Sequence, residues 1–90
     1  MDKETIMEKI EARVMSEKHK DYTLWTIGVT DRPDERKDEH KNDGKNVDFW
    51  NQWKADSEKD ARAIEEFYIE KKKMKGGGGG PGSADYVYIF

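Results

Sequence analysis

The alternation of hydrophobic and polar positions predicts six elements along the chain. Residues 2–18 carry apolar side chains at Ile6, Ile10 and Val14, a spacing that predicts an amphipathic helix with charges on its other face. Residues 22–30 are mostly β-branched or aromatic, with large groups on both alternating faces. This pattern predicts a strand that is buried on two sides and lies centrally in a sheet.

The middle of the chain predicts a second helix and a second strand. Asp31 can cap a helix that begins near Pro33 and covers residues 34–41, a segment without any aliphatic side chain. We expect this short, exposed helix to end near Gly44. Residues 47–55 place three aromatic side chains among polar ones, which predicts a strand with a possible bulge.

The last third of the chain predicts a helix, a loop and a strand. Residues 56–60 resemble a capped helix start, and the helix reaches the lysines at 71–73. Residues 76–85 are expected to be a glycine-rich loop, because successive glycines with a proline neither continue a helix nor form an ordinary strand. Residues 86–90 then predict the final strand.

These elements predict an α/β (α+β) fold in the order helix, strand, helix, strand, helix, strand. A chain of 90 residues has room for one core, so residues 1–90 are expected to form a single domain. We expect a small three-stranded sheet, covered on at least one face by the first and third helices. The pattern leaves parallel and antiparallel pairing open.

Charge and composition limit the classes of function. The chain is 33% hydrophobic and 41% charged, and its net charge of −3 creates no general attraction to phosphate backbones or anionic lipid. Any nucleic-acid site must therefore be a local patch. The absence of cysteine excludes disulfides and thiolate metal sites. No apolar run approaches the roughly 20 residues of a membrane span, so we expect a cytoplasmic protein without membrane contact; its oligomeric state is open.

One constellation of residues suggests a family. The segment 26–30, Thr-Ile-Gly-Val-Thr, is followed by Arg36 and His40, which are four residues apart and thus on one helical face. Together with Glu65 on the later helix, this order resembles the second half of the GIY-YIG nuclease signature. The resemblance covers residues 26–65.

The resemblance implies a metal-dependent phosphodiesterase or endonuclease acting on DNA or RNA. In this interpretation Arg36 grips phosphate, Glu65 binds Mg²⁺ or Mn²⁺, and His40 assists proton transfer. The residue types suit the reaction, because an arginine fork binds two phosphate oxygens and a divalent cation stabilises the leaving oxyanion.

The chain departs from the family at its signature tyrosines. Thr26 stands at the position of one tyrosine, and a helix replaces the strand that carries the other. Phenols that can substitute are Tyr22, Tyr86 and Tyr88. Without the signature tyrosines, we favour a non-catalytic binding module with a phosphate or nucleic-acid contact, and the enzyme is the alternative.

Each candidate residue also has a simpler interpretation. Arg36 and His40 can belong to a solvated charged helix, and Glu65 can be a surface carboxylate. A second possible anion site is the start of the glycine-rich loop, where backbone amides can form a nest, although a flexible loop after a lysine-rich helix end is favoured. The residues of that site are Lys73, Lys75, Gly76 and Gly77. The three tryptophans are expected to form core rather than a base-stacking platform.

Overall fold

The computed structural model describes residues 1–18, 20–76 and 84–90. They form a small α+β domain, which confirms the predicted fold class. The helices are α1 (Lys3–Ser16), η1 (Tyr22–Leu24, a 3₁₀ turn), α2 (Pro33–Asn42) and α3 (Glu58–Glu70). The strands are β1 (Thr26–Thr30), β2 (Asn51–Lys54), β3 (Lys75–Gly76) and β4 (Tyr86–Ile89).

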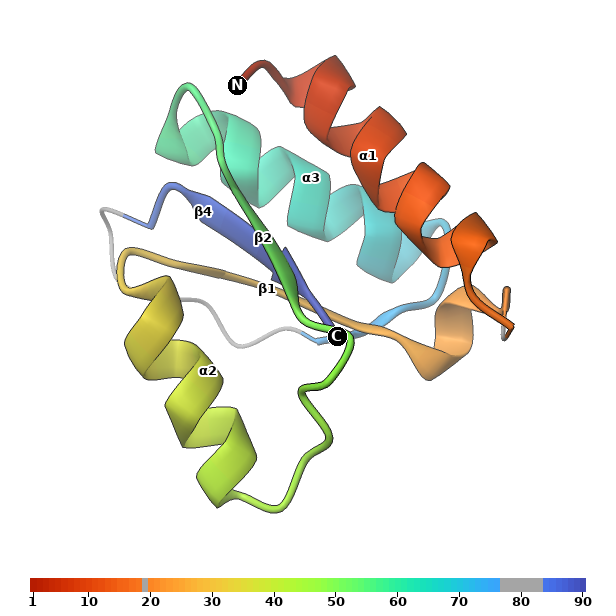
Figure 1. Ribbon diagram of the computed structural model, residues 1–90. Helices are drawn as coiled ribbons and strands as arrows, with labels where there is room; N and C mark the ends of the chain where they lie inside the picture. The colour runs from red at the N-terminus through yellow and green to blue at the C-terminus, as the bar shows by residue number, and fades with distance from the viewer. Residues whose placement is uncertain (19, 77–83) are drawn as a thin grey trace.

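The strands form one mixed sheet in the order β2-β4-β1-β3. Strand β4 is antiparallel to both β1 and β2, whereas β3 is parallel to β1. The predicted central position of β1 is confirmed, since it lies between β4 and β3. Helices α1 and α3 lie side by side on one face of the sheet, and α2 lies on the other (Figure 1).

The main core lies between the sheet and the pair α1 and α3. Alternate residues of β1 and β4 point towards these helices, as the two-residue period of a strand requires. The largest fully buried aliphatic side chains of this core are Ile6, Ile10, Val14, Ile27, Ile64, Val87 and Ile89. The apolar stripe predicted for the first helix is therefore its buried face.

Local hydrogen bonds define the ends of α1 and α3 and tie the two helices together. The Asp2 carboxylate accepts a hydrogen bond from the Thr5 amide, and the Ser57 hydroxyl accepts one from the Asp60 amide. The Tyr68 hydroxyl on α3 is 3.1 Å from the backbone oxygen of Met7, on α1. The capped helix start predicted within residues 56–60 is thus confirmed, with Ser57 as the cap, and α1 is attached by both apolar and polar contacts.

Two predicted strands are shorter in the structure. The strand expected over 22–30 begins at Thr26, because the Asp21 carboxylate caps a 3₁₀ turn by accepting a hydrogen bond from the Thr23 amide. The strand expected over 47–55 begins at Asn51. Before it the chain turns, with the Trp50 amide bonded to the carbonyl of Val47. In both segments local turns replaced strand pairing.

The sheet has one strand more than predicted. Lys75 and Gly76 pair with β1, although the sequence pattern placed Gly76 in a loop. A side chain at Gly76 would collide with the carbonyl oxygen of Ile27, so glycine permits the close approach. Residues 77–83 of the expected 76–85 loop lie outside the described residues.

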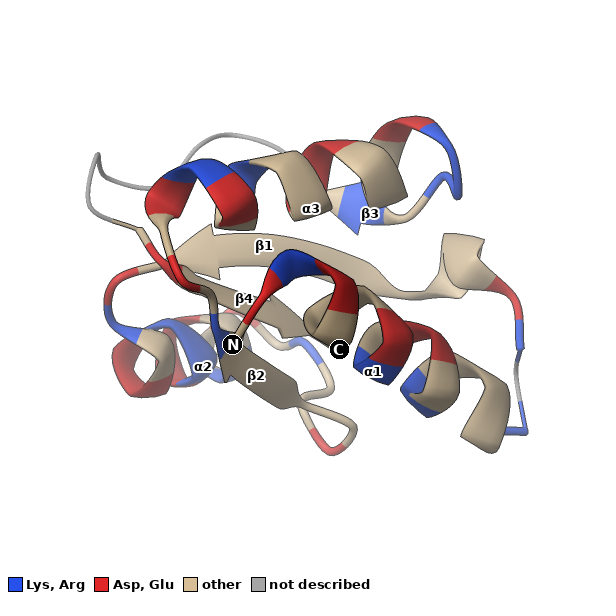
Figure 2. Ribbon diagram, turned by 90° about the horizontal axis from the view of Figure 1, so that it is seen from above, with Lys and Arg blue, Asp and Glu red and all other residues tan. Residues whose placement is uncertain are grey.

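Charged residues of both signs alternate along the helices. Figure 2 shows acidic and basic segments interspersed on α1, α2 and α3 rather than separated by sign. This mixture of signs on these helices agrees with the small net charge of −3. Within the described part of the chain, no helix has the length and apolar character needed to cross a membrane.

Candidate functional site

A cleft of about 1000 Å³ lies beside β1 and brings together residues from both layers of helices. Its walls come from β1, α2, α3, β3 and β4. Among its lining residues are Thr26, Arg36, His40, Glu65, Lys75 and Tyr88. The three residues of the GIY-YIG resemblance, Arg36, His40 and Glu65, thus line one cavity together with one of the proposed substitute phenols.

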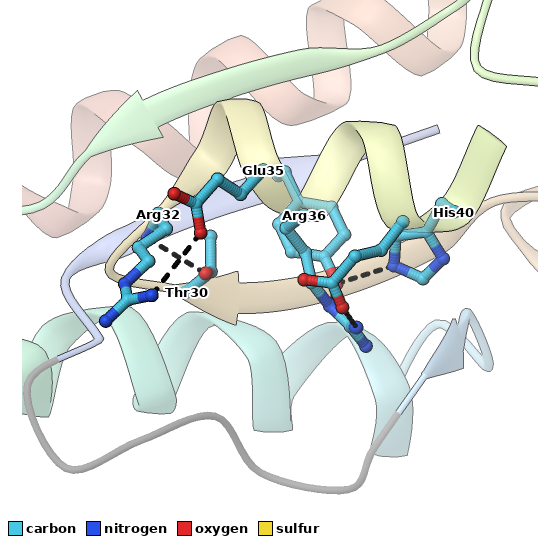
Figure 3. A network of polar contacts seen from close by, with 7 residues as sticks. Thr30, Arg32, Glu35, Arg36 and His40 are labelled. Carbon is cyan, nitrogen blue, oxygen red and sulfur yellow. Dashed lines mark hydrogen bonds and ion pairs between the residues drawn. The ribbon is translucent and has the colours of Figure 1, made fainter. Parts of the chain in front are cut away.

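The end of β1 sets the direction of α2. The Thr30 hydroxyl accepts a hydrogen bond of 3.0 Å from the Arg32 amide, and Pro33 occupies the first turn of the helix. The helix cap is Arg32 and uses no side-chain hydrogen bond, so the predicted capping role of Asp31 is wrong. Figure 3 shows Arg36 and His40 one turn apart, projecting from the same side of α2.

Both side chains meet the Tyr88 hydroxyl of β4. The Arg36 Nε is 3.4 Å and the His40 Nε2 is 3.0 Å from the Tyr88 oxygen. Tyr88 pairs with Gly28 across the sheet, and its ring lies directly over that glycine. Any side chain at Gly28 would collide with the phenol, so the glycine of the Thr-Ile-Gly segment makes room for it.

His40 lies in an aromatic pocket rather than on an exposed helix face. It is 6% exposed, and its ring centroid is 4.7 Å from that of Phe90 and 5.6 Å from that of Tyr88. Burial lowers the pKa of His40 below its ordinary value, and the positive charges of Arg36 and Lys45 add to the effect. The interpretation of this residue as part of a solvated face is wrong.

The hydrogen bonding of His40 indicates its tautomer. The Nδ1 atom is buried and has no hydrogen-bond partner in the described residues. A buried N–H without an acceptor is rarer than a buried acceptor without a donor, which favours the proton on Nε2. That nitrogen then donates to the Tyr88 oxygen, as Arg36 does, and the phenol proton of Tyr88 is left for a group in the cleft.

Tyr88 is suited to donate a proton in a hydrogen bond, not to act as a base. Burial raises the pKa of Tyr88 above its ordinary value, although the hydrogen bond from Arg36 acts in the opposite direction. The residue is 3% exposed, so its hydroxyl remains protonated at neutral pH. Arg36 is 41% exposed at its side chain and carries a full positive charge. A guanidinium beside a phenol donor is an arrangement that binds anions.

The other charges of the cleft are partly paired with one another. Arg36 forms an ion pair with Glu39 at 3.0 Å, and Arg32 forms one with Glu35 at 3.4 Å. Two further lining residues, Lys45 and Lys75, have no ion-pair partner in the part of the chain that the structure describes. With Arg32 and Arg36 they make four cations among the lining residues. These equal in number the four lining carboxylates, which are Asp31, Glu35, Glu39 and Glu65.

Glu65 lies on α3 and is half-buried in the wall of the cleft. Burial raises the pKa of Glu65, while Arg62 acts in the opposite direction. No group of three or more His, Asp or Glu side chains capable of holding a metal occurs in residues 1–18, 20–76 and 84–90. A divalent cation at Glu65 would take most of its ligands from water and from a bound phosphate, as Mg²⁺ commonly does.

The structure separates the remaining predicted residues from this cleft. Tyr22 stacks on Tyr68 at 6.1 Å, because the 3₁₀ turn removes it from the strand face it was expected to share with Thr26. Tyr86 lies under the ammonium of Lys54. Neither phenol lines the cleft.

The predicted anion loop is only partly described. Lys73 is exposed and does not line the cleft, and Gly77 lies outside the described residues. The Lys75 amide donates to the carbonyl of Trp25, so it is not available to a nest. Lys75 contributes its side chain to the cleft as part of β3.

Many lining residues were not predicted from the sequence, among them Lys45, Phe49 and Phe90. The signal for Phe49 was the break in alternation at the Phe-Trp pair, where the chain turns instead of extending. Lys45 follows a helix end, and Phe90 ends the last predicted strand; nothing local distinguishes either from a surface or core residue.

Comparison with known proteins yields no relative. No protein-family model matches the chain, and neither the curated proteins nor the solved structures provide a match. The likeness to GIY-YIG domains therefore rests on the order and spacing of the residues described above.

Proposed function

We propose that this domain is a non-catalytic, GIY-YIG-like binding module whose cleft holds a phosphate group of a nucleic acid or nucleotide. The observation that carries the proposal is the convergence of Arg36 and His40 on the Tyr88 hydroxyl at the wall of the cleft. The guanidinium supplies charge and the N–H donors of its Nη2, since its Nε faces Tyr88 and its Nη1 faces Glu39, and the phenol supplies a further donor. Lys45 and Lys75 offer two further ammonium groups, in a cleft whose lining cations and carboxylates are equal in number.

Phosphate binding is favoured over phenol-based catalysis by the protonation states. A general base must accept a proton near neutral pH, whereas burial raises the pKa of Tyr88. His40 has a lowered pKa, but its Nε2 is occupied by the Tyr88 hydroxyl. Because Tyr88 stays protonated and the Nε2 of His40 is engaged, Tyr88 and Arg36 remain as hydrogen-bond donors towards an anion.

The test compares two variants that remove the same charge from α2. Arg36→Gln removes the proposed phosphate ligand, whereas Lys37→Gln removes an exposed neighbour that does not line the cleft. We expect Arg36→Gln to weaken binding of diphosphate or a labelled oligonucleotide roughly tenfold or more, the effect of losing charged hydrogen bonds. Lys37→Gln should change it little. Calorimetric titration and fluorescence anisotropy measure both affinities.

Two further variants separate the phosphate contact from folding. Tyr88→Phe keeps the ring over Gly28 but removes the hydroxyl, so it should also weaken binding. Arg36→Lys keeps the charge and loses the fork, so it should restore binding only in part. Equal binding by Arg36→Gln and the wild type, with both folded by circular dichroism, would refute the proposal.

A second candidate function is a divalent-metal-dependent phosphodiesterase or endonuclease. The observation that favours it is that Glu65 lines the same cleft as Arg36 and His40. Mg²⁺ or Mn²⁺ held by Glu65 would stabilise the leaving oxygen of a phosphodiester. In this candidate Arg36 orients the phosphate and His40 assists proton transfer.

Cleavage assays decide between the two candidates. Supercoiled, linear and single-stranded DNA and RNA are incubated with Mg²⁺ or Mn²⁺, with a chelator control. Glu65→Gln tests the metal ligand, and Glu66→Gln, an exposed neighbour on the same helix, is its matched control. Metal-dependent cutting that is lost only in Glu65→Gln establishes the enzyme. Absence of cutting by the wild type excludes it for these substrates.

A further inference from the structure

A smaller, apolar cavity adjoins the cleft. A second cavity of about 360 Å³ is lined by Leu24, Trp25 and Phe49, with Phe90, Glu17 and Lys18. Three of these residues, Leu24, Phe49 and Phe90, also line the main cleft. We call these three residues the apolar shelf. The charged cleft and the apolar cavity therefore adjoin and share these side chains.

The shelf exposes apolar surface that the core leaves uncovered. Leu24 is 55% exposed and Phe49 is 46% exposed, whereas the aliphatic side chains under α1 and α3 are almost completely buried. Exposed large apolar groups beside a polar cavity are typical of a binding surface. The apolar shelf is thus the part of the cleft that suits an apolar portion of a ligand.

Neighbouring side chains hold the Phe49 ring in place. The guanidinium carbon of Arg13 lies 5.7 Å from the ring centroid, and Trp25 contacts the ring at 6.4 Å with a tilt of 52°. A ring that is supported by these contacts and still half-exposed loses little conformational entropy on binding. Phe49 is therefore prepared to receive a flat group.

Aromatic contacts connect the shelf to the phosphate end. Phe90 belongs to the shelf and stacks with Tyr88, centroid to centroid at 6.1 Å. Tyr88 is the residue whose hydroxyl meets Arg36. The stacked rings of Tyr88 and Phe90 would thus lie between an anion at Arg36 and a flat group on the apolar shelf.

We propose that the cleft binds single-stranded nucleic acid, with a phosphate at Arg36 and Tyr88 and an unpaired base stacked on Phe49 of the apolar shelf. This inference rests on the proposed phosphate-binding function and adds the class of ligand. A nucleotide joins a phosphate to a flat base, and the two adjoining cavities offer a charged site for the first and an apolar surface for the second. In a duplex the bases are stacked on one another, and their faces are closed to the shelf.

The charge of the protein limits the number of phosphates bound. A net charge of −3 provides no long-range attraction, so affinity depends on the few cations of the cleft. For single strands, the logarithm of the affinity falls with that of salt concentration by about 0.7 per phosphate contacted. We expect a shallow slope that corresponds to one or two phosphates.

The test uses three probes of equal length on the full chain. They are a labelled oligothymidine, the abasic oligonucleotide that keeps the sugar–phosphate backbone, and the duplex. By anisotropy we expect the base-carrying single strand to bind about tenfold tighter than the other two, the effect of one stacked base. Equal binding of the base-carrying and abasic strands would overturn the inference.

Matched phenylalanine variants locate the base. Phe49→Ala should reduce binding of oligothymidine to the level of the abasic strand, and Phe49→Tyr should keep the preference. Phe67→Ala removes another exposed phenylalanine, on α3 and outside the cleft, and should have no effect. If Phe49→Ala still binds oligothymidine more tightly than the abasic strand, the inference is overturned.

The failure of this inference can be distinguished from that of the proposed function. If Arg36→Gln weakens binding of all three probes while the base makes no difference, phosphate binding stands and base stacking fails. If no probe depends on Arg36, the phosphate site fails, and the inference fails with it.

Discussion

Three side chains from distant parts of the sequence determine the chemistry of the cleft. Arg36 and His40 reach the Tyr88 hydroxyl across 52 and 48 residues of sequence. Burial is the main cause of the lowered pKa of His40 and of the raised pKa of Tyr88, and the hydrogen bond from Arg36 opposes the shift of Tyr88. At this scale the structure favours a protonated phenol and a neutral imidazole.

His40 makes the stability of the fold sensitive to acid. Because its pKa is lowered in the folded state, its stabilising contribution is present above the unfolded-state value of 6.5 and is lost as pH falls through the folded-state value. Arg36 and Lys45 oppose protonation, while Asp43 and Glu39 favour it. We expect the free energy of unfolding to decrease as pH falls below about 6.5.

Urea denaturation at several pH values measures this effect, and NMR titration of the imidazole gives its pKa. A His19→Gln background removes the other histidine of the sequence, so that the titration belongs to His40. A pKa of His40 at or above 6.5 in the folded protein would contradict the prediction.

At the scale of elements, the pairing of β1 with β4 builds the site. Gly28 faces Tyr88 in the ladder, and the next pair, Val29 and Val87, points into the core on the other face. One register thus supplies both the buried core and the phenol under α2, because successive strand residues alternate between faces. A shift by one residue would exchange the two roles.

Gly28→Ala tests this arrangement. Alanine normally suits a strand better than glycine, but its methyl group would collide with the Tyr88 ring. We expect a loss of about 1–3 kcal/mol in the free energy of unfolding, the usual cost of overpacking. In a Tyr88→Ala background the same substitution should cost much less, which a double-mutant cycle by urea denaturation would show. Additive effects of the two substitutions would argue against the contact.

At the scale of the whole molecule, a single core carries both helix α1 and the sheet. Ile6, Ile10 and Val14 are completely buried, and Tyr68 of α3 contacts the backbone of Met7. Since a domain of this size has a small stability margin, α1 is a necessary part of the fold rather than an appendage. The cleft takes side chains from both α2 and α3 and depends on this core for its support.

Ile10→Ala should destabilise the whole domain by about 2–5 kcal/mol, the cost of a cavity in the core. Because the core is continuous, we expect one unfolding transition, with tryptophan fluorescence and circular dichroism changing together. Met15→Ala, on the exposed side of the same helix, is the control and should change stability by less than about 0.5 kcal/mol. Separate transitions for the two signals would show that α1 unfolds independently.

Local sequence patterns predicted the α+β class and most of the element positions. Helical spacing identified the buried stripe of α1, and Ser57 marked the start of α3, because amphipathic period and capping depend on neighbouring residues. The predictions were wrong where a turn competed with a strand, before Thr26 and before Asn51. The hydrogen bonds of a turn are also local, but the sequences that form such turns differ little from the sequences of strand ends.

The sequence by itself therefore determined the helices, the central strand and the order of Arg36, His40 and Glu65. Only the tertiary structure decided that Tyr88, rather than Tyr22 or Tyr86, meets Arg36, that His40 is buried, and that Phe49 lies beside the cleft. The physical reason is the range of the interactions. Helix period and caps act within a few residues, whereas strand register and the packing of α2 bring together residues about 50 positions apart.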